Sequence, residues 1–512
     1  MKHAEYLRCD ATALAALVRR GEVSADELLT LALAQLDRVQ PQLNAVVHRF
    51  EARARAQVAA ASGAWRGPLA GVPMLLKDGL QHLAGEPTLA GCRAALRLPV
   101  PTRHAAVTRR LLDAGCVVFG KTNLPELGLK GVSDSALHGP VCNPWDLSRN
   151  AGGSSGGAAA AVAAGVLPMA AGSDGGGSLR IPAAWCGLFT LKPSRGRISE
   201  APELGEVWFG ACTHGVITRS VRDCALALDV LAGPEPGDPI VCAPPSVVWT
   251  DVGARPLRRL RIGMSTASPV GAPVHAQAVA AVQRAATLLR DLGHEVVESA
   301  PAIDGRALAR AYLAMYLGQV PAEVALLRAA GARSGEFELL TRAMEVLGRA
   351  SSAAALTAEL ARWNDFARTL GDWFGRHDLL LTPTTAVEPL PQGATDLPRG
   401  QALALDAVVR SGLLGLLARR GWIDGVVDAV AHENLAPVPF TQLANLTGTP
   451  AMSVPLHHTP SGLPMGVQFM APIGDEATLL QLAAQLEQAA PWFDRLPALA
   501  SGDAAAPGLR PS

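Results

Sequence analysis

The sequence predicts an α/β protein whose sheet contains parallel strand pairs. Short apolar runs bounded by glycine or proline alternate with longer amphipathic segments, which is the pattern of strands connected through helices. Hydrophobic residues make up 49% of the 512 residues and charged residues 18%, so the chain has enough apolar side chains for a large core. Because a single core rarely grows beyond roughly 250–300 residues, this length indicates either two domains or one large α/β domain with insertions.

The N-terminal third is predicted to begin with two helices, after which strands and helices alternate. Residues 11–40 are predicted to form two helices, and the second begins at Ser24 with Glu27 three positions later, which is a capping box. The segments that follow are predicted to be buried strands at 68–77 and 116–120, a helix at 104–114 and, inside the glycine-rich stretch 150–178, an alanine-rich helix at 157–164.

The same alternation resumes after residue 259. Strands are predicted at 260–264, 294–299, 378–382, 451–455 and 466–470. Helices are predicted at 274–292, through most of 305–375, at 402–430 and at 475–487. We expect the tail 501–512 to be frayed, because it is rich in small residues and lies at a chain end.

Charge, cysteine content and hydropathy exclude several classes of protein. Lys+Arg and Asp+Glu both number 45, and a net charge of zero argues against a nucleic-acid binder that relies on a general basic field. Eight cysteines are too few for a disulfide scaffold, so we expect reduced and mostly buried thiols. The N-terminus lacks the pattern of a signal peptide, and the longest uncharged, mostly apolar run, 156–172, is too poor in large apolar residues for a membrane span. We therefore expect a cytoplasmic protein with neither a nucleic-acid nor a membrane partner.

Two serines embedded in glycine mark the segment 150–182. Ser154 lies in GGSSGG and Ser178 in DGGGS. Glycine lets a substrate approach main-chain N–H groups closely, and successive N–H groups in such a turn can bind an oxyanion. The composition alone is equally compatible with a pair of flexible glycine loops.

Other catalytic motifs fit this chain poorly. The triplet Gly152-x-Ser154-x-Gly156 formally matches the nucleophile elbow of α/β-hydrolases, but turn-like residues precede it where that motif needs a strand. The glycine-rich stretch contains neither a P-loop nor a dinucleotide-binding motif. His457 and His458 are adjacent and would point to opposite faces of a strand, and there is no HExxH, so we expect no metal site.

Lys77 is the remaining candidate, because it follows the apolar run VPMLL. Burial lowers the pKa of an amine, and a neutral amine can act as a general base. A strand-end lysine that reaches water or pairs with Asp78 is the alternative. One lysine and two glycine-embedded serines together indicate a serine hydrolase with a lysine base.

Several segments between residues 71 and 487 resemble the amidase signature family, in the order in which that family carries them. They are GVPMLLKDG (71–79), GKTNLPELG (120–128), GPVCNPWD (139–146), GGSSGGAAAAVAAG (152–165), GSDGGGSLRIPAAWCGLFTLKPSRGRIS (172–199), GVITRSVRDCALALDVLAGP (215–234), DLLLTPT (378–384), TQLANLTGTPAMSVPL (441–456) and GLPMGVQFMAPIGDEATLLQLAAQLE (462–487). The resemblance implies the amidase-signature fold, a large mixed central β-sheet flanked by helices on both faces. It further implies a single domain over 1–500, with a catalytic core at about 65–235 and 376–490 and a variable helical specificity region at about 300–435.

The resemblance also implies a Ser–cisSer–Lys triad without metal or cofactor. The family's nucleophile falls on Ser178, its bridging serine on Ser154, which a cis peptide bond joins to Gly153, and its base on Lys77. The oxyanion hole falls on the backbone N–H groups of Gly175, Gly176, Gly177 and Ser178. Supporting hydrogen bonds are implied for Ser155, Asp174 and Arg180.

The substrate is expected to be a small or linear amide that reacts with water. DGGGS and the LGLKG stretch at 127–131 depart from the pattern usual in amidotransferase A subunits. DGGGS followed by IPA resembles stand-alone hydrolases of nylon-type oligoamides, aryl acylamides and carbamates, so a carbamate is the main variant and ester hydrolysis a side reaction. The alternatives are the A subunit of a tRNA-dependent amidotransferase and a catalytically silent binding protein. The loop 131–138 and five aromatic residues are candidates for the acyl or aryl pocket, unless the aromatic residues serve only core packing: Tyr312, Tyr316, Trp363, Trp373 and Trp422. The oligomeric state stays open, and a homodimer is compatible with the resemblance.

Overall fold

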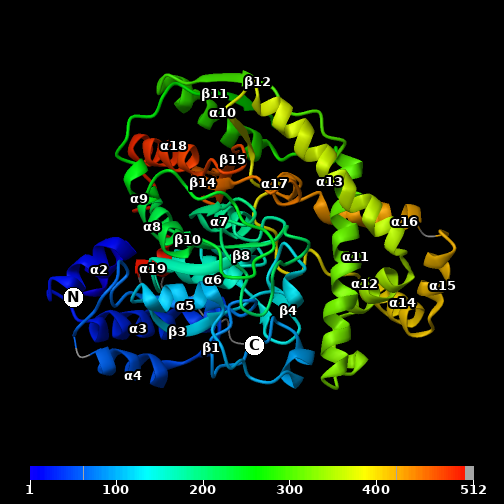
Figure 1. Cartoon of the computed structure of the whole chain (residues 1–512), viewed down its shortest axis with the longest axis horizontal. Coiled ribbons are helices and arrows are strands. Elements are labelled where there is room, and N and C mark those ends of the chain that lie inside the picture. The colour runs from blue at the N-terminus through cyan, green and yellow to red at the C-terminus, as the bar shows by residue number, and fades with distance from the viewer. Residues whose placement is uncertain (62, 423, 502–512) are drawn as a thin grey trace.

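The protein is built around an eight-stranded mixed sheet (Figure 1). The computed structural model describes residues 1–61, 63–422 and 424–501. In spatial order the strands are β12 (Glu295–Glu298), β11 (Arg261–Met264), β13 (Leu379–Pro383), β15 (Pro464–Met470), β14 (Ala451–His458), β9 (Phe189–Lys192), β10 (Thr213–Thr218) and β8 (Met169–Asp174). β11 pairs in parallel with β12 and β13, and the remaining pairs are antiparallel. The sheet therefore contains the predicted parallel pairs but is mostly antiparallel.

Helices cover both faces of this sheet, as the resemblance implied. Side chains of β13 alternate between two cores: Leu379 and Leu381 point to one and Leu380 to the other. The first core contains residues of α8 (Val221–Leu231), α10 (Ala276–Asp291) and α18 (Glu476–Ala489). The opposite face is covered by α6 (Gly156–Ala163), α7 (Arg180–Cys186), α11 (Gly305–Ala329), α13 (Ala353–Phe374) and α17 (Gln442–Thr447). Both faces are buried, which explains why the strands are apolar runs rather than alternating ones.

A separate three-stranded sheet carries the predicted N-terminal strands. β3 (Val117–Thr122) lies between β1 (Val46–Arg49) and β2 (Pro73–Lys77), antiparallel to the former and parallel to the latter. β2 contacts β8 of the central sheet, so its last residue lies beside the end of a strand almost 100 positions later. The minor sheets pair β4 (Asp134–Ser135) with β5 (Gly139–Pro140) and β6 (Cys142–Asn143) with β7 (Asp146–Asn150).

The remaining helices lie around these sheets. They are α1 (His3–Leu7), α2 (Ala11–Arg19), α3 (Ala25–Leu43), α4 (Glu51–Ala61), α5 (Ala106–Asp113), α9 (Trp249–Val252), α12 (Leu339–Ala350), α14 (Arg399–Arg410), α15 (Leu413–Arg419), α16 (Asp424–Leu435) and α19 (Ala498–Ser501), with short 3₁₀ turns at Arg93–Arg97, Glu126–Gly128 and Ser334–Glu336. The predicted capping box of α3 is confirmed, because the Ser24 Oγ accepts from the Glu27 amide (3.1 Å) and the Ser24 amide donates to Glu27 Oε2 (2.9 Å).

The sequence prediction differs from the structure in several places. The glycine-rich stretch contains the strand β8 and leads into α7, where only loops and one helix were predicted, because its small residues lack the apolar pattern of a strand. β9 and β10 were also missed. The helix predicted at 402–430 is interrupted at Gly412, whose φ of +75° ends α14 and starts α15 in a new direction. Of the tail predicted to fray, Ser501 ends α19 and the rest lies outside the described residues.

Small residues allow α6 to be buried along its whole length. A Cβ on Gly157 would overlap the backbone of Asn123, and one on Gly156 would overlap the side chain of Ser133. The residues Asn123 and Ser133 thus pack directly against the backbone of α6, and the N-terminus of the helix is buried inside the protein.

The cysteines agree with the expectation of unpaired, mostly buried thiols. All eight are free, and five of them are buried: Cys92, Cys116, Cys186, Cys212 and Cys224.

Hydropathy singles out no membrane-spanning helix in the described ranges. Only α14 and α15 taken together have the length and composition of a span, and the two are bent by 76° relative to each other.

A buried ion pair joins the segment after β9 to α18, and its loss is expected to destabilise the fold. Arg197 lies 3.0 Å from Glu476, which also accepts from the Ser194 amide, and the two side chains are 3% and 0% exposed. Arg197→Met leaves the Glu476 charge buried and unpaired, so we expect the free energy of unfolding in a urea titration to fall by about 3–5 kcal/mol.

Two controls test this interpretation. Removing both partners, in Arg197→Met/Glu476→Leu, is expected to restore most of the lost stability, because no unpaired charge remains. Arg20→Met, which breaks an exposed pair with Glu22, is expected to leave unfolding nearly unchanged. A double variant as unstable as Arg197→Met would contradict the ion-pair explanation.

Candidate active site

The three residues predicted to carry the chemistry lie at the ends of three different elements. Lys77 is the last residue of β2. Ser154 directly precedes Ser155, the N-cap of α6, and Ser178 lies in the turn that connects β8 to α7. The contact between β2 and β8 brings the lysine to the N-termini of both helices.

The Lys77 amine is buried against two hydroxyl groups. Its Nζ lies 2.8 Å from the Ser154 Oγ and 3.0 Å from the Ser173 Oγ, and Lys77 is 2% exposed. Burial lowers the pKa of Lys77 to about 8, although the nearby Cys212 and Asp174 act in the opposite direction. Of the alternatives for this lysine, the pairing with Asp78 is not seen: Asp78 lies 3.8 Å from Lys121 instead.

The turn before α6 is held by the loop that precedes it. The peptide bond between Gly153 and Ser154 is cis, as the resemblance implied. The Ser133 Oγ donates to the Gly152 carbonyl (2.9 Å) and accepts from the Gly156 amide (3.2 Å), and the Gly152 amide donates to Asn150 Oδ1 (2.9 Å). These bonds fix the position of the Ser154 hydroxyl.

Ser155 links the two serine turns to each other. Its amide donates to the Ser178 carbonyl (3.1 Å), and its Oγ donates to the Ser173 carbonyl (3.2 Å). Among the hydrogen bonds between described residues, none joins the Ser178 Oγ to the Ser154 Oγ. The structure thus joins Lys77 to Ser154 directly and holds Ser178 beside them through its backbone.

Asp174 and Arg180 organise the turn that carries Ser178. The Arg180 guanidinium donates to both Asp174 oxygens, at 2.9 Å each, and both side chains are fully buried. Burial alone would raise the pKa of Asp174, but the Arg180 charge and the hydrogen bonds outweigh it and hold that pKa well below its usual range. The carboxylate also accepts from the amides of Gly177 (2.7 Å) and Leu179 (3.2 Å). Asp174 is therefore ionised and fixes the course of the backbone through the turn.

The four amides implied for an oxyanion hole are not equivalent. The Gly177 amide donates to Asp174 and is engaged within the turn. The amides of Gly175, Gly176 and Ser178 have no hydrogen-bond acceptor among the described residues. The Gly176 carbonyl accepts from Thr441 Oγ1 (2.6 Å) and Gln442 Nε2 (3.2 Å), so this peptide plane is held from behind.

Aromatic side chains lie directly on the glycines of this turn. A Cβ on Gly176 would overlap the Tyr312 hydroxyl, and a Cβ on Gly175 would come within 2.5 Å of the Trp208 indole. Tyr312 shares a hydrogen bond of 2.7 Å with Tyr316, whose ring meets that of Trp208 edge to face at 5.0 Å. We call Trp208, Tyr312 and Tyr316 the aromatic wall; the two tyrosines were predicted candidates, and Trp208 was missed.

The other predicted aromatic residues lie elsewhere. Trp363 is buried, and the Arg195 guanidinium lies over its ring, 5.5 Å from the centroid of the indole. Trp373 stacks on His377 at 4.0 Å and donates to the Ser299 Oγ, which is core packing. Trp422 is 67% exposed.

Sequence reasoning missed most of the residues that surround this triad. Ser173 lies in the GSDGGGS segment and contacts Lys77, but the sequence pattern predicted no role for it. Gln81 accepts from the Lys77 amide (2.7 Å), and Asn445 donates to Asp174 (2.9 Å). No local pattern marks Gln81 or Asn445, because their partners lie on other elements. No group of three or more His, Cys, Asp or Glu side chains suited to a metal occurs in the described part of the chain.

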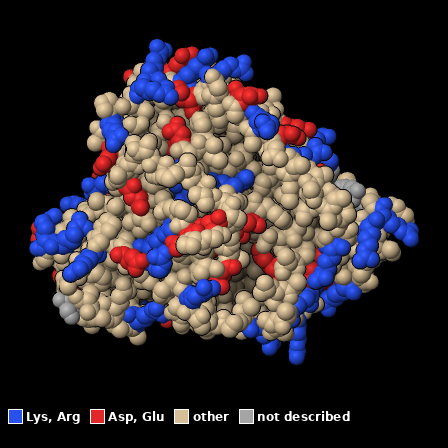
Figure 2. All heavy atoms as spheres, in the orientation of Figure 1, with Lys and Arg blue, Asp and Glu red and all other residues tan. Residues whose placement is uncertain are grey.

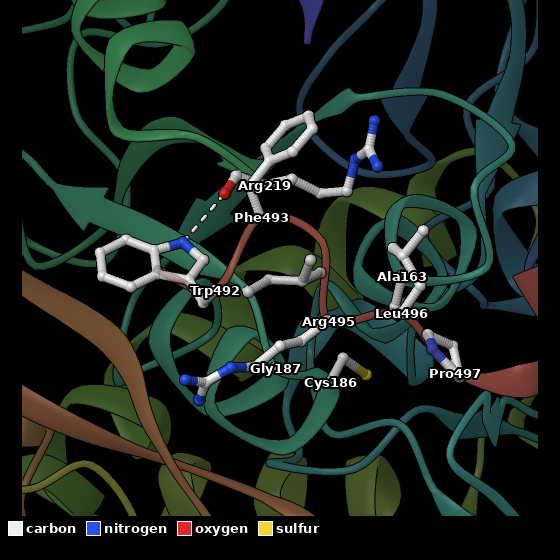
Figure 3. Close-up of a pocket in the computed structure, with 10 residues that line it drawn as sticks. Ala163, Cys186, Gly187, Arg219, Trp492, Phe493, Arg495, Leu496 and Pro497 are labelled. Carbon is white, nitrogen blue, oxygen red and sulfur yellow. Dashed lines mark hydrogen bonds between the residues drawn. The ribbon is translucent and has the colours of Figure 1, made fainter. Parts of the chain in front are cut away.

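A hollow at the C-terminal ends of α6 and α7 lies apart from Lys77, Ser154 and Ser178 (Figure 3). It is lined by residues that include Ala163, Cys186 and several of the residues 492–497. There the Trp492 indole donates to the Arg219 carbonyl (2.9 Å), and the Arg219 guanidinium lies over the Phe493 ring. None of Lys77, Ser154 and Ser178 lines it, so we assign it no part in the chemistry.

Comparison with known proteins shows which family the chain resembles. The family model named Amidase matches residues 27–412 and 424–480. A 6-aminohexanoate-cyclic-dimer hydrolase of Pseudomonas sp. (strain NK87) is 35% identical over 96% of each chain. A solved 6-aminohexanoate cyclic dimer hydrolase superposes with a TM-score of 0.86 at 34% identity, over 96% of this chain and 99% of its own. A bacterial aryl acylamidase of the amidase signature family superposes with a TM-score of 0.82 at 28% identity, over 95% and 98%.

The buried Lys77 amine is expected to make stability depend on pH. Its pKa is about 8 in the folded protein and 10.5 when unfolded, so the unfolded state binds more protons between these values and stability rises with pH. Lys77→Met removes the free-energy cost of burying a protonated amine. Its stability advantage over wild type should be about 2–3 kcal/mol larger at pH 7 than at pH 10, measured by urea unfolding at both pH values. Lys2→Met, which removes an exposed amine, is the control. An advantage for Lys77→Met that did not change with pH would show that the amine is not buried in this way.

Proposed function

The chain belongs to the amidase family, and from that premise we propose that it hydrolyses the C–N bond of a small or linear amide through an acyl-enzyme on Ser178. The observation that carries the proposal is the 2.8 Å contact between the buried Lys77 amine and the Ser154 hydroxyl. The backbone of Ser178 lies beside this pair through the Ser155 amide. A nucleophile next to a proton acceptor that is itself oriented by a third group is the general arrangement of covalent hydrolases.

In the proposed reaction the proton moves along the triad toward the lysine. The neutral Lys77 amine accepts the Ser154 proton, Ser154 Oγ accepts the Ser178 proton, and the Ser178 Oγ attacks the amide carbonyl. The tetrahedral intermediate collapses when the C–N bond breaks and the departing amine receives a proton back through Ser154. Water then attacks the acyl-enzyme along the same route and releases the acid.

The oxyanion of the intermediate would be bound by backbone amides of the turn. The amides of Gly175, Gly176 and Ser178 are free to donate, whereas that of Gly177 is engaged by Asp174 and acts by positioning its neighbours. Removing one oxyanion donor typically costs about 10²–10³ in rate. Ser155, Asp174 and Arg180 hold this loop and do not touch the reacting atoms.

The surroundings of Ser178 favour an uncharged acyl group. The aromatic wall presents neutral rings and the Tyr312 hydroxyl beside Gly175 and Gly176, and burial raises the pKa of Tyr312 above its ordinary value, so the phenol stays protonated. Aromatic rings bind flat or apolar groups well. We therefore propose a small amide, an anilide or a linear oligoamide as substrate. An aryl carbamate would be cleaved by the same attack, and esters as a side reaction.

Replacing the nucleophile tests the proposal. Ser178→Ala should lower kcat/KM by about 10⁴-fold or more, because no acyl-enzyme can form. The measurement compares release from a p-nitroanilide, a primary amide, a linear aminohexanoate dimer, an aryl carbamate and glutamine. Ser148→Ala is the matched control, since Ser148 is exposed in β7. Hydrolysis of glutamine alone, and only after partner chains are added, would point to an amidotransferase subunit instead.

The pH profile of the reaction tests the role of the lysine. Lys77 must be neutral to accept a proton, and its pKa lies near 8. We expect kcat/KM to rise about tenfold per pH unit below 8 and to level off above it. An activity maximum below pH 6 would exclude a neutral lysine as the base.

A further inference from the structure

An apolar and basic surface lies on α14, on α15 and on Arg420 and Trp422, which follow α15. Six of the thirteen exposed large apolar residues of the described chain fall between positions 397 and 430. We call the α14–α15 surface the set Leu403, Leu413, Leu416 and Trp422 together with four exposed arginines, Arg399, Arg410, Arg419 and Arg420. Leu403 is 72% and Trp422 67% exposed, values unusual for side chains that cost free energy in water.

The opposite side of these helices is attached to the protein. Leu414 is buried, and Gly415 packs close to Val346 of α12. Arg342 of α12 forms an ion pair with Asp406 of α14 at 2.6 Å. The exposed apolar side chains therefore belong to the outer faces of anchored helices, and the described part of the chain leaves them largely uncovered.

The charge of the surface has one sign. Asp406 is the only acidic residue between 399 and 422, and it is shared by Arg342 (2.6 Å) and Arg410 (2.7 Å). The guanidinium of Arg420 lies 5.1 Å from the Trp422 ring centroid. At the end of the molecule where Figure 1 places α15, Figure 2 shows arginine side chains projecting outward. Arginine beside exposed leucine and tryptophan is the composition of helices that lie in a membrane interface.

Neither helix alone is long enough to span a bilayer, and a surface position fits their lengths. α14 has 12 residues and α15 has 7, or about 18 Å and 10 Å, against a hydrocarbon thickness of about 30 Å. The two helices are also bent by 76°. Such a pair has its apolar side chains at the level of the headgroups and leaves the arginines in contact with phosphate.

The charge also argues against a second copy of the chain as the occupant. A two-fold contact would place the same four arginines opposite one another, and residues 399–422 contain no acidic side chain beyond Asp406 to neutralise them. A bilayer with anionic headgroups supplies the missing charge and an apolar layer at once.

We propose that the α14–α15 surface docks the protein peripherally onto a bilayer that carries anionic headgroups. This inference is independent of the proposed reaction. The sequence analysis expected no membrane partner, and this proposal differs from that expectation. Hydropathy along the sequence detects membrane spans, but it does not detect an exposed apolar face on a folded helix pair.

Vesicle sedimentation with the full chain tests the proposal. The protein should bind vesicles of equal parts phosphatidylglycerol and phosphatidylcholine at low salt, bind pure phosphatidylcholine far less, and be released by about 0.5 M salt. Arg399→Gln/Arg419→Gln should weaken binding by about fivefold per arginine, the factor that corresponds to about 1 kcal/mol for each basic residue near the surface. Leu416→Ser/Trp422→Ser should abolish it.

A matched variant separates the surface from general stickiness. Leu326→Ser removes another exposed leucine, 66% exposed on α11, and should bind as wild type does. The thermal midpoint and the hydrolysis of a soluble amide should stay unchanged in all variants, since none of these residues touches the triad. The proposal fails if wild type ignores anionic vesicles, if the α14–α15 variants bind as wild type, or if Leu326→Ser binds as weakly as they do. It also fails if light scattering finds a dimer that Leu416→Ser/Trp422→Ser dissociates, because a second copy would then cover the surface.

Discussion

The ion pair between Asp174 and Arg180 is the interaction on which the rest of the site depends. It joins the last residue of β8 to the first residue of α7, and both side chains are withdrawn from water. Such a pair persists only when the remaining hydrogen-bonding capacity is filled. Asn445 fills part of it on the carboxylate side, and the Thr441 carbonyl and Gln468 accept from the guanidinium. One charge pair thereby connects β8, α7, α17 and β15 around the turn that carries Ser178.

Position, rather than acidity, distinguishes Lys77 from the other buried lysines. Burial also lowers the pKa of Lys121 to about 8 and that of Lys192 to about 7. The Lys121 amine, however, bonds the Pro87 carbonyl and the Thr88 hydroxyl and lies beside Asp78, and Lys192 donates to the Pro193 carbonyl. Only Lys77 faces hydroxyl groups of the serine turns. A neutral amine can serve a nucleophile only where it reaches the hydroxyl that would pass on the nucleophile's proton, and this contact with Ser154 is what supports Lys77 as the proposed base.

The helical segment between residues 305 and 435 contributes two different surfaces. On its inner side, α11 places Tyr312 against the glycines of the Ser178 turn. On its outer side, α14 and α15 expose leucine, tryptophan and arginine to the surroundings. In the proposed reaction the serine turns at the sheet supply the reacting groups, whereas this segment supplies the side chains beside them and, on its outer side, the surface proposed to dock on a bilayer.

The local sequence by itself determined the start of α3, several of the buried strands and the candidate residues Lys77, Ser154 and Ser178, because capping boxes, apolar runs and glycine-embedded serines are read from neighbouring residues. It did not reveal β8, whose alanines and glycines carry no strand pattern, nor the partners Ser173, Gln81 and Asn445. Only the tertiary structure decided that the Gly177 amide is engaged, that Trp208 joins the two tyrosines, and that Trp422 faces outward. Each of these depends on contacts between elements distant in the chain, and the free energy that sets them comes from burial and long-range hydrogen bonds, which no short stretch of residues contains.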